Sequence, residues 1–198
     1  VPSLSEITRE IWPRPKVLIL SFPHNPTGAV VDLDFFREVV DFAKQNQIVL
    51  IHDLAYADIV FDGYEAPSLL QVEGAKEVGI EFMSLSKSYH MAGWRCGFAV
   101  GNPELVSVLA KIKGYYDYGI FAPIQVAGIT ALRSDPSLVR EHARLYQERR
   151  NVLIEGLNRI GWSVPSPRAS MFVWAPIPQA YKNLSSMEFA TKLLDEAQ

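Results

Sequence analysis

The sequence predicts an α/β protein with a mostly parallel but mixed sheet and flanking helices, followed by the beginning of a smaller α+β domain. The sheet is predicted from short, almost wholly apolar runs in the first half of the chain, because strands buried within a parallel sheet are apolar on both faces. The helices are predicted from apolar residues at helical spacing between the first two runs and after residue 103. The apolar runs cover residues 17–22, 48–51, 80–85 and 96–100.

Residues 17–53 are expected to form one strand–helix–strand unit. The run 17–22 ends at Pro23 and predicts a strand buried on both faces. After a turn-rich stretch, Asp32 is placed to cap a helix that ends near Asn46. The run 48–51 then predicts a second, parallel strand joined by a right-handed crossover. The helical apolar residues are Phe35, Phe36, Val39, Val40 and Ala43.

The third and fourth runs predict two further strands. The third, 80–85, ends at Ser86 and Lys87. The fourth, 96–100, begins so soon after Lys87 that no crossover helix fits between them, and we therefore expect it to run antiparallel to the third. The sheet is then mixed.

Beyond Pro103 the pattern is mainly helical. Residues 162–177 return to extended character, but four prolines restrict them to short or edge strands, and 185–197 predict a capped amphipathic helix. We expect residues 1–140 to be the C-terminal part of a large domain, and 141–198 to be a linking helix with part of a small domain. The three earlier helices are expected at residues 104–118, 123–133 and 136–160.

Composition excludes several classes of partner. The 198 residues carry a net charge of −3, and they contain no block of Lys and Arg, so nucleic acid is not expected. No leader and no apolar run of membrane-spanning length is present, and the single cysteine, Cys96, cannot form an intrachain disulfide; we expect a cytoplasmic protein without a membrane partner. Because the chain begins at Val1 and ends within a helical pattern, we expect it to be a piece of a longer protein.

Polar residues follow three of the predicted strands. Asn25 follows the first, Asp53 the second, and Lys87 the third, together with Ser84 and Ser86. Ligands of open α/β sheets bind along the carboxyl ends of the strands, so the sequence predicts a binding site at this edge. Taken singly, each residue also has an ordinary explanation, in which Asn25 forms a turn, Asp53 caps a helix and Lys87 is solvated.

In this order and at these separations, four segments resemble the class I/II aminotransferases of the fold-type I group of pyridoxal-phosphate (PLP) enzymes. The resemblance covers nearly the whole chain, and it implies that residues 1–140 belong to the PLP-binding large domain of that fold. The segments that carry it are Asn25-Pro26-Thr27-Gly28, Asp53-Leu54-Ala55-Tyr56, Ser84-Leu85-Ser86-Lys87 and Gly93-Trp94-Arg95.

The resemblance implies a role for each strand-end residue. Lys87 is implied to form a Schiff base with the PLP aldehyde, which requires a neutral amine. Once displaced by the substrate amine, Lys87 is implied to move a proton between the substrate Cα and the C4′ carbon of the cofactor. Asp53 resembles the carboxylate that keeps the pyridine nitrogen protonated, and this makes the ring an electron sink.

Five further residues resemble the groups that hold the cofactor. Tyr56 and Asn25 resemble the hydrogen-bond donors to the phenolate oxygen of the ring. Ser84, Ser86 and Arg95 resemble the phosphate-binding residues, among which the guanidinium supplies a planar charged fork. The family turn also implies a cis peptide bond between Asn25 and its proline.

The implied reaction is a ping-pong transfer of an amino group between an amino acid and a 2-keto acid, in a homodimer. Residues 116–125 and 169–174 resemble the subgroup of alanine and LL-diaminopimelate aminotransferases. The family's arginine for the substrate carboxylate is expected outside this chain, and Arg168 is expected on the surface. A PLP-dependent carbon–sulfur lyase and the PLP-binding domain of a transcriptional regulator share the fold and remain alternatives.

The other polar and aromatic residues are expected to be structural. The histidines lack the companions and spacing of a metal site, so no metal is expected. His52 is expected to point away from the Asp53 side of its strand and to be packed or hydrogen-bonded. Trp94 and Cys96 are expected in the core. Two readings stay open, a substrate site or a packing or dimer surface, for Tyr115, Tyr116 and Tyr118.

Overall fold

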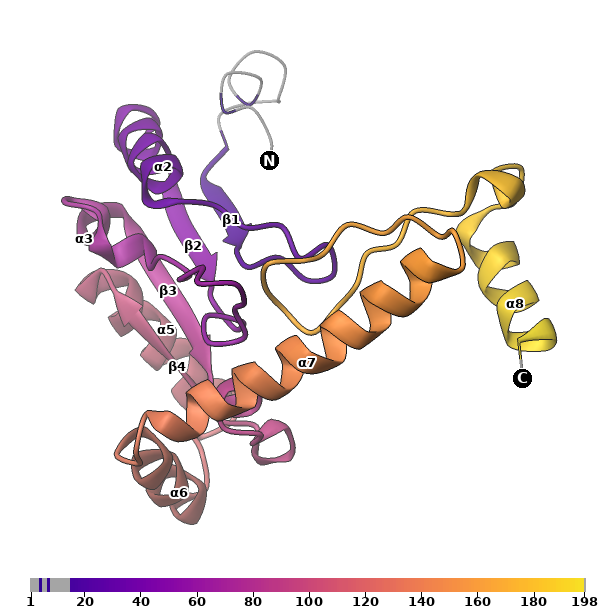
Figure 1. Ribbon diagram of the computed structural model, residues 1–198. Coiled ribbons are helices and arrows are strands. Elements are labelled where there is room, and N and C mark those ends of the chain that lie inside the picture. Colours follow the sequence, from indigo (N-terminus) through magenta and orange to yellow (C-terminus); the bar gives the residue numbers. More distant parts are fainter. Residues whose placement is uncertain (1–3, 5–6, 8–14, 198) are drawn as a thin grey trace.

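A computed structural model describes residues 4, 7 and 15–197 of the chain and contains a four-stranded sheet with flanking helices (Figure 1). The strands follow one another in sequence order across the sheet. β1 pairs with β2 and β2 with β3 in parallel, whereas β3 and β4 are antiparallel, so the predicted mixed sheet is confirmed. The strands are β1 (Val17–Ser21), β2 (Val49–Asp53), β3 (Gly79–Ser84) and β4 (Gly97–Gly101).

Helix α2 (Leu33–Asn46) covers one face of the sheet and builds the main core. Its predicted cap is confirmed, because the Asp32 carboxylate accepts the backbone N–H of Phe35 at 2.9 Å. The helix ends at the predicted residue, since Gln47 takes a left-handed conformation with φ 54°. The buried face of α2 packs with Leu20 and Leu50 of the sheet; its buried residues are Phe36, Val39, Val40 and Ala43.

The prediction that the first strand is buried on both faces was wrong. Leu20 of β1 is only 5% exposed, but Val17 and Ile19, which project from the opposite face, are 45% and 68% exposed. An apolar run indicates a strand, but it does not show that both faces are covered. Within the described residues, this side of β1 stays open to solvent.

The helices of the second half lie within two residues of the predicted ranges. Several short helices were not predicted, because a single turn gives too little periodicity to detect. The long helices are α5 (Pro103–Tyr116), α6 (Ala122–Leu132), α7 (Ser137–Arg159) and α8 (Ser186–Glu196). The short ones are η1 (Leu69–Gln71), α3 (Ala75–Val78), α4 (Leu85–Ser88), η2 (Ala92–Trp94) and η3 (Gln179–Tyr181).

Residues 162–177 are extended but form no named strand, and their one recorded bridge joins Ala169 to Val60. Figure 1 shows this stretch turning back from the end of α7 toward the loops beyond β1 and β2. The predicted domain boundary after residue 140 falls inside α7, and the division into two domains stays a prediction. No described helix combines the length and apolarity needed to cross a membrane.

Candidate active site

The sheet register brings the predicted polar residues to one edge. Ser21 at the end of β1 lies opposite Asp53 at the end of β2, and Asp53 lies opposite Phe82 in β3. Helix α4, which carries Lys87, begins directly after β3. The carboxyl ends of three parallel strands therefore meet where the sequence predicted a binding site.

Asn25, Tyr56 and Lys87 come together from three separate segments. The Asn25 side-chain amide donates a hydrogen bond to the Tyr56 hydroxyl oxygen at 3.3 Å. The Lys87 Nζ atom lies 5.7 Å from the centroid of the Tyr56 ring. The Asn25–Pro26 peptide bond is cis, as predicted.

Burial raises the pKa of Tyr56, and the negative charge of Asp53 raises it further. The ring is only 6% exposed, and the hydroxyl therefore keeps its proton at neutral pH. Because Asn25 donates to the oxygen of this hydroxyl, the hydroxyl proton of Tyr56 is free to be donated to a ligand. Tyr56 is thus arranged as a hydrogen-bond donor.

Asp53 lies in the open part of this edge. Asp53 is exposed, and one of its carboxylate oxygens accepts the backbone N–H of Ala55 at 3.2 Å. A carboxylate has about four lone-pair sites, so most of its accepting capacity remains available. Asp53 can therefore bind a cationic or protonated group of a ligand.

Ser84, Ser86 and Arg95 lie on neighbouring segments, but the structure does not join all three. The Ser84 hydroxyl caps α4 by accepting the backbone N–H of Ser86 at 3.1 Å. Leu85 donates its backbone N–H to the Cys96 carbonyl at 3.1 Å, and this places the Arg95 backbone next to the serine turn. The Arg95 guanidinium itself donates to the carbonyl of Ala92 at 2.9 Å.

Sequence reasoning missed the contact between the 167–172 stretch and this site. The Phe172 ring meets the Tyr56 ring edge-on at 5.8 Å. A Cβ on Gly28, which has φ +68°, would lie 3.0 Å from the Pro167 Cβ. These contacts join residues far apart in the sequence, and no local pattern marks them.

His52 is the packed histidine that the sequence predicted. It is fully buried on the sheet face opposite Asp53, with Nδ1 2.8 Å from a Glu81 carboxylate oxygen. Its Nε2 lies 3.1 Å from the carbonyl of Phe22. The partner Glu81 was not foreseen, because the contact depends on the β2–β3 register.

Other expectations had mixed outcomes. Trp94 was predicted in the core but is 47% exposed, while Cys96 is half-buried. Arg168 is exposed and lies 4.9 Å above the Tyr64 ring, in agreement with a surface role. Both interpretations of the tyrosine cluster stay open, since its members are 82%, 88% and 93% exposed, in the order Tyr115, Tyr116 and Tyr118.

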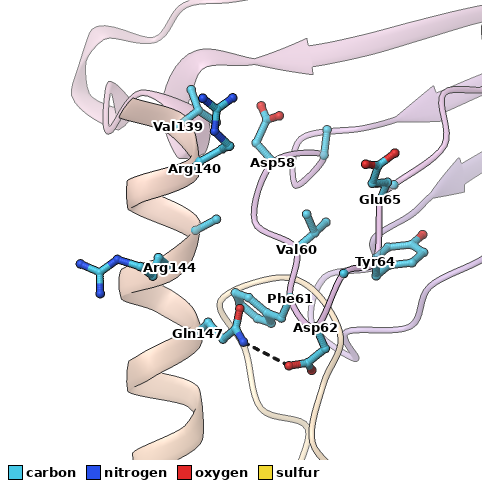
Figure 2. Close-up of a pocket in the computed structure, with 14 residues that line it drawn as sticks. Asp58, Val60, Phe61, Asp62, Tyr64, Glu65, Val139, Arg140, Arg144 and Gln147 are labelled. Carbon is cyan, nitrogen blue, oxygen red and sulfur yellow. Dashed lines mark hydrogen bonds between the residues drawn. The ribbon is translucent and has the colours of Figure 1, made fainter. Parts of the chain in front are cut away.

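A groove of about 540 Å³ lies between residues 57–66 and the first turns of α7 (Figure 2). Its lining includes Asp58, Asp62 and Arg140 but not Asp53, Tyr56 or Lys87. The groove is therefore a separate feature from the strand-end site. Chemical function follows from the reactive groups at the strand ends and not from the size of this hollow.

The residues at the strand ends fit a phosphorylated pyridine aldehyde such as PLP. An amine is available to bond an aldehyde, and a carboxylate lies exposed for a protonated ring nitrogen. A phenol proton is free to be donated to a ring oxygen. The Ser84 hydroxyl oxygen accepts the Ser86 N–H, so its proton can still be donated to a phosphate.

The sequence profile of the family described as "Aminotransferase class I and II" matches residues 3–198. The chain is 56% identical to the glutamate-pyruvate aminotransferase AlaC of Escherichia coli (strain K12), over 98% of this chain and 47% of that protein. It is 47% identical to an LL-diaminopimelate aminotransferase of Moorella thermoacetica, over 100% of this chain and 50% of that protein.

A solved structure gives a similar result. The N-succinyldiaminopimelate aminotransferase from Mycobacterium tuberculosis superposes with a TM-score of 0.90 at 30% identity, over 98% of this chain and 50% of that one. The chain therefore spans about half the length of the curated relatives it matches.

Proposed function

The chain belongs to the class I and II aminotransferase family, and from this premise we propose that the protein containing it is a PLP-dependent aminotransferase in which Lys87 carries the cofactor. The observation that carries the proposal is the convergence of Asn25, Tyr56 and Lys87 beside the carboxylate of Asp53. Three segments far apart in sequence supply these groups, one of them both Asp53 and Tyr56, and their convergence supports a ligand site.

In this proposal the cofactor, when bound, supplies an electron sink that stabilises negative charge at the substrate Cα. Asp53 holds the proton on the ring nitrogen, and Tyr56 and Asn25 donate hydrogen bonds to the ring oxygen. Because burial and Asp53 raise the pKa of Tyr56, its hydroxyl is a neutral donor over the working pH range.

Lys87 has two tasks in the proposal: its amine bonds the cofactor, and later moves a proton at the substrate Cα. The nearby Tyr56 ring, 5.7 Å from the Lys87 nitrogen, limits where this amine can go. Ser84, Ser86 and Arg95 hold the phosphate. For Arg95 this requires that the guanidinium exchange its bond to Ala92 for the phosphate.

We propose small-molecule amino acids and 2-keto acids as substrates. The similarity to AlaC of E. coli makes glutamate with pyruvate the first pair to test, and the similarity to the M. thermoacetica protein makes LL-diaminopimelate the second. The names of these relatives support transamination over carbon–sulfur lysis. The predicted homodimer, cytoplasmic location and absence of a metal remain predictions.

The test is to trap the cofactor in the intact protein that contains this sequence. Borohydride reduction followed by peptide mapping should place the label on Lys87, and Lys87→Ala should lose both the label and transamination. Lys76→Ala, at an exposed lysine of α3, is the matched control and should keep both. A label that persists in Lys87→Ala would refute the central assignment.

Asp53→Ala should give a different defect. The variant should retain PLP through Lys87 but lose most turnover, because the ring nitrogen loses the carboxylate that keeps it protonated. Turnover and bound cofactor are measured on the same preparation. Loss of both in equal measure would assign Asp53 to binding and not to catalysis.

A further inference from the structure

Residues 167–172, here called the returning segment, connect the C-terminal part of the chain to the candidate site. Two backbone hydrogen bonds hold it to the loop after β2, from Phe61 N–H to the Arg168 carbonyl at 2.9 Å and from Ser170 N–H to the Ile59 carbonyl at 2.8 Å. It has one isolated bridge and no regular ladder. Side-chain contacts add to these two backbone hydrogen bonds in placing it.

Arg150 of α7 supplies such a side chain. It is only 6% exposed, and its two terminal nitrogens donate to the Asp62 carboxylate at 2.5 and 2.9 Å. One of them also donates to the Pro167 carbonyl at 2.8 Å. The guanidinium lies 4.9 Å above the Phe61 ring. A planar, bidentate donor is the geometry in which arginine binds a carboxylate most firmly.

Asp62 is fixed from a second direction. Figure 2 shows Asp62 and Phe61 on the loop facing α7, with Gln147 bonded to Asp62 at 3.2 Å. The hydrogen bond from Arg150 lowers the pKa of Asp62 against the opposing effect of burial, so the carboxylate stays ionised at neutral pH. The contact set of Asp62, Arg150 and Pro167 is here called the Arg150 anchor.

We propose that Arg150 is a positioning residue for the candidate site, because the Arg150 anchor holds the returning segment where Phe172 packs against Tyr56. The path from anchor to ring is short and stiff. Ser170 is 1% exposed, has φ 69°, and accepts the Phe172 N–H on its hydroxyl at 3.2 Å. A shift of the segment at Pro167 is therefore passed to Phe172.

The effect on the cofactor rests on the function proposed above. Tyr56 can donate to the ring oxygen while its ring is held in place, and Asn25 at the hydroxyl and Phe172 beside the ring both contribute to this. Loss of the anchor loosens the ring and weakens this hydrogen bond. The negatively charged ring oxygen is then less stabilised, and the chromophore that joins the cofactor to Lys87 titrates at higher pH.

The test uses the intact protein that contains this sequence. Arg150→Met should raise the midpoint of the pH titration of the cofactor's visible absorbance by about half a unit, as expected when most of one hydrogen bond is lost. Phe172→Ala should give a similar shift, and the double variant no more than the larger single shift. In cofactor-free protein, Arg150→Met should speed hydrogen exchange at the Phe172 backbone N–H.

Two further variants keep the test decisive. Asp62→Asn preserves shape but removes the charge, and it should shift the midpoint in the same direction by less, even if Arg150→Met does not fold. Arg144→Met alters an arginine of the same helix whose partners, Glu141 and Glu148, are exposed, and it should change neither readout.

Three outcomes would overturn the positioning role. These are additive shifts from Arg150→Met and Phe172→Ala, faster exchange with an unchanged midpoint, and no change in either readout. The first would mean separate routes to the cofactor, and the second a purely structural role. A wild-type protein without a visible lysine-linked band would instead refute the proposed function, and the exchange experiment would still decide whether Arg150 holds the segment.

Discussion

Glu81 is a buried residue of the sheet whose carboxylate contacts three other groups, and replacing it should lower the free energy of unfolding substantially. Its side chain is 2% exposed. One oxygen lies 2.8 Å from His52 Nδ1 and accepts the Leu69 N–H at 2.8 Å, and the other accepts the Ser68 hydroxyl at 2.8 Å. His52 in turn bonds the carbonyl of Phe22. The network ties the ends of β1 and β2 to the middle of β3 and to η1.

Two substitutions at Glu81 separate charge from shape. Glu81→Ala leaves His52, Ser68 and Leu69 without their shared partner, and breaking a buried pair in this way costs about 3–5 kcal/mol. Glu81→Gln keeps one oxygen for Ser68 and an amide group within hydrogen-bonding distance of His52 Nδ1. Only the Leu69 N–H then loses its acceptor, which costs about 1–2 kcal/mol.

The free energy of unfolding is measured from urea titrations of the intact protein and of the two variants. Glu77→Ala removes an exposed glutamate that pairs with Lys44, and it should cost at most about 1 kcal/mol as the matched control. Equal losses for Glu81→Ala and Glu81→Gln, or a loss below about 1 kcal/mol for alanine, would refute the reasoning. The network would then be readily replaced by water or by repacking.

Two other predictions concern the turn beside the site and the segment after Lys87. Gly28→Ala should lower the free energy of unfolding, measured in urea, by about 1–3 kcal/mol, because a residue in the left-handed region would carry a Cβ only 3.0 Å from Pro167. Gly63→Ala is the control, since Gly63 has a similar φ but open space around it, and it should cost less. Equal costs would exclude the Pro167 contact as the cause. The pKa of His90 is lowered first by burial and then by the charge of His142, whose ring stacks on it at 3.8 Å. As the pH falls below about 6.5, the unfolded chain therefore binds a proton at His90 more readily than the folded chain does, and stability is lost. His90→Asn should flatten this loss between pH 7.5 and 5.5, and an unchanged slope would contradict the assignment.

Local patterns were enough to predict the four strands and the long helices around the site, but not α4, the single turn that carries Lys87. The cap at Asp32 and the end of the helix at Asn46 follow from single-residue preferences, and the antiparallel fourth strand follows from the short connection after Lys87. The polar residues at the strand ends were predicted together because parallel strands bring their carboxyl ends to one edge. These inferences need no knowledge of long-range packing.

Contacts that depend on register or on distant segments were not predictable. The pairing of His52 with Glu81 requires that these residues face one another across β2 and β3. Arg150 meets Asp62 across 88 positions of the sequence. The exposure of Trp94 was not predictable either, because an apolar residue next to a strand does not reveal whether another element covers it.

The returning segment also imposes an order on assembly. The four strands pair with their sequence neighbours, so the sheet can form from contacts that are short in sequence. The bond between Asp62 and Arg150 closes a loop of 88 residues, and its entropic cost is met only after α7 exists. During synthesis, Tyr56 can therefore pack against Phe172 only after residue 172 has left the ribosome. A chain stopped before Pro167 would have a paired sheet but a loosely held tyrosine.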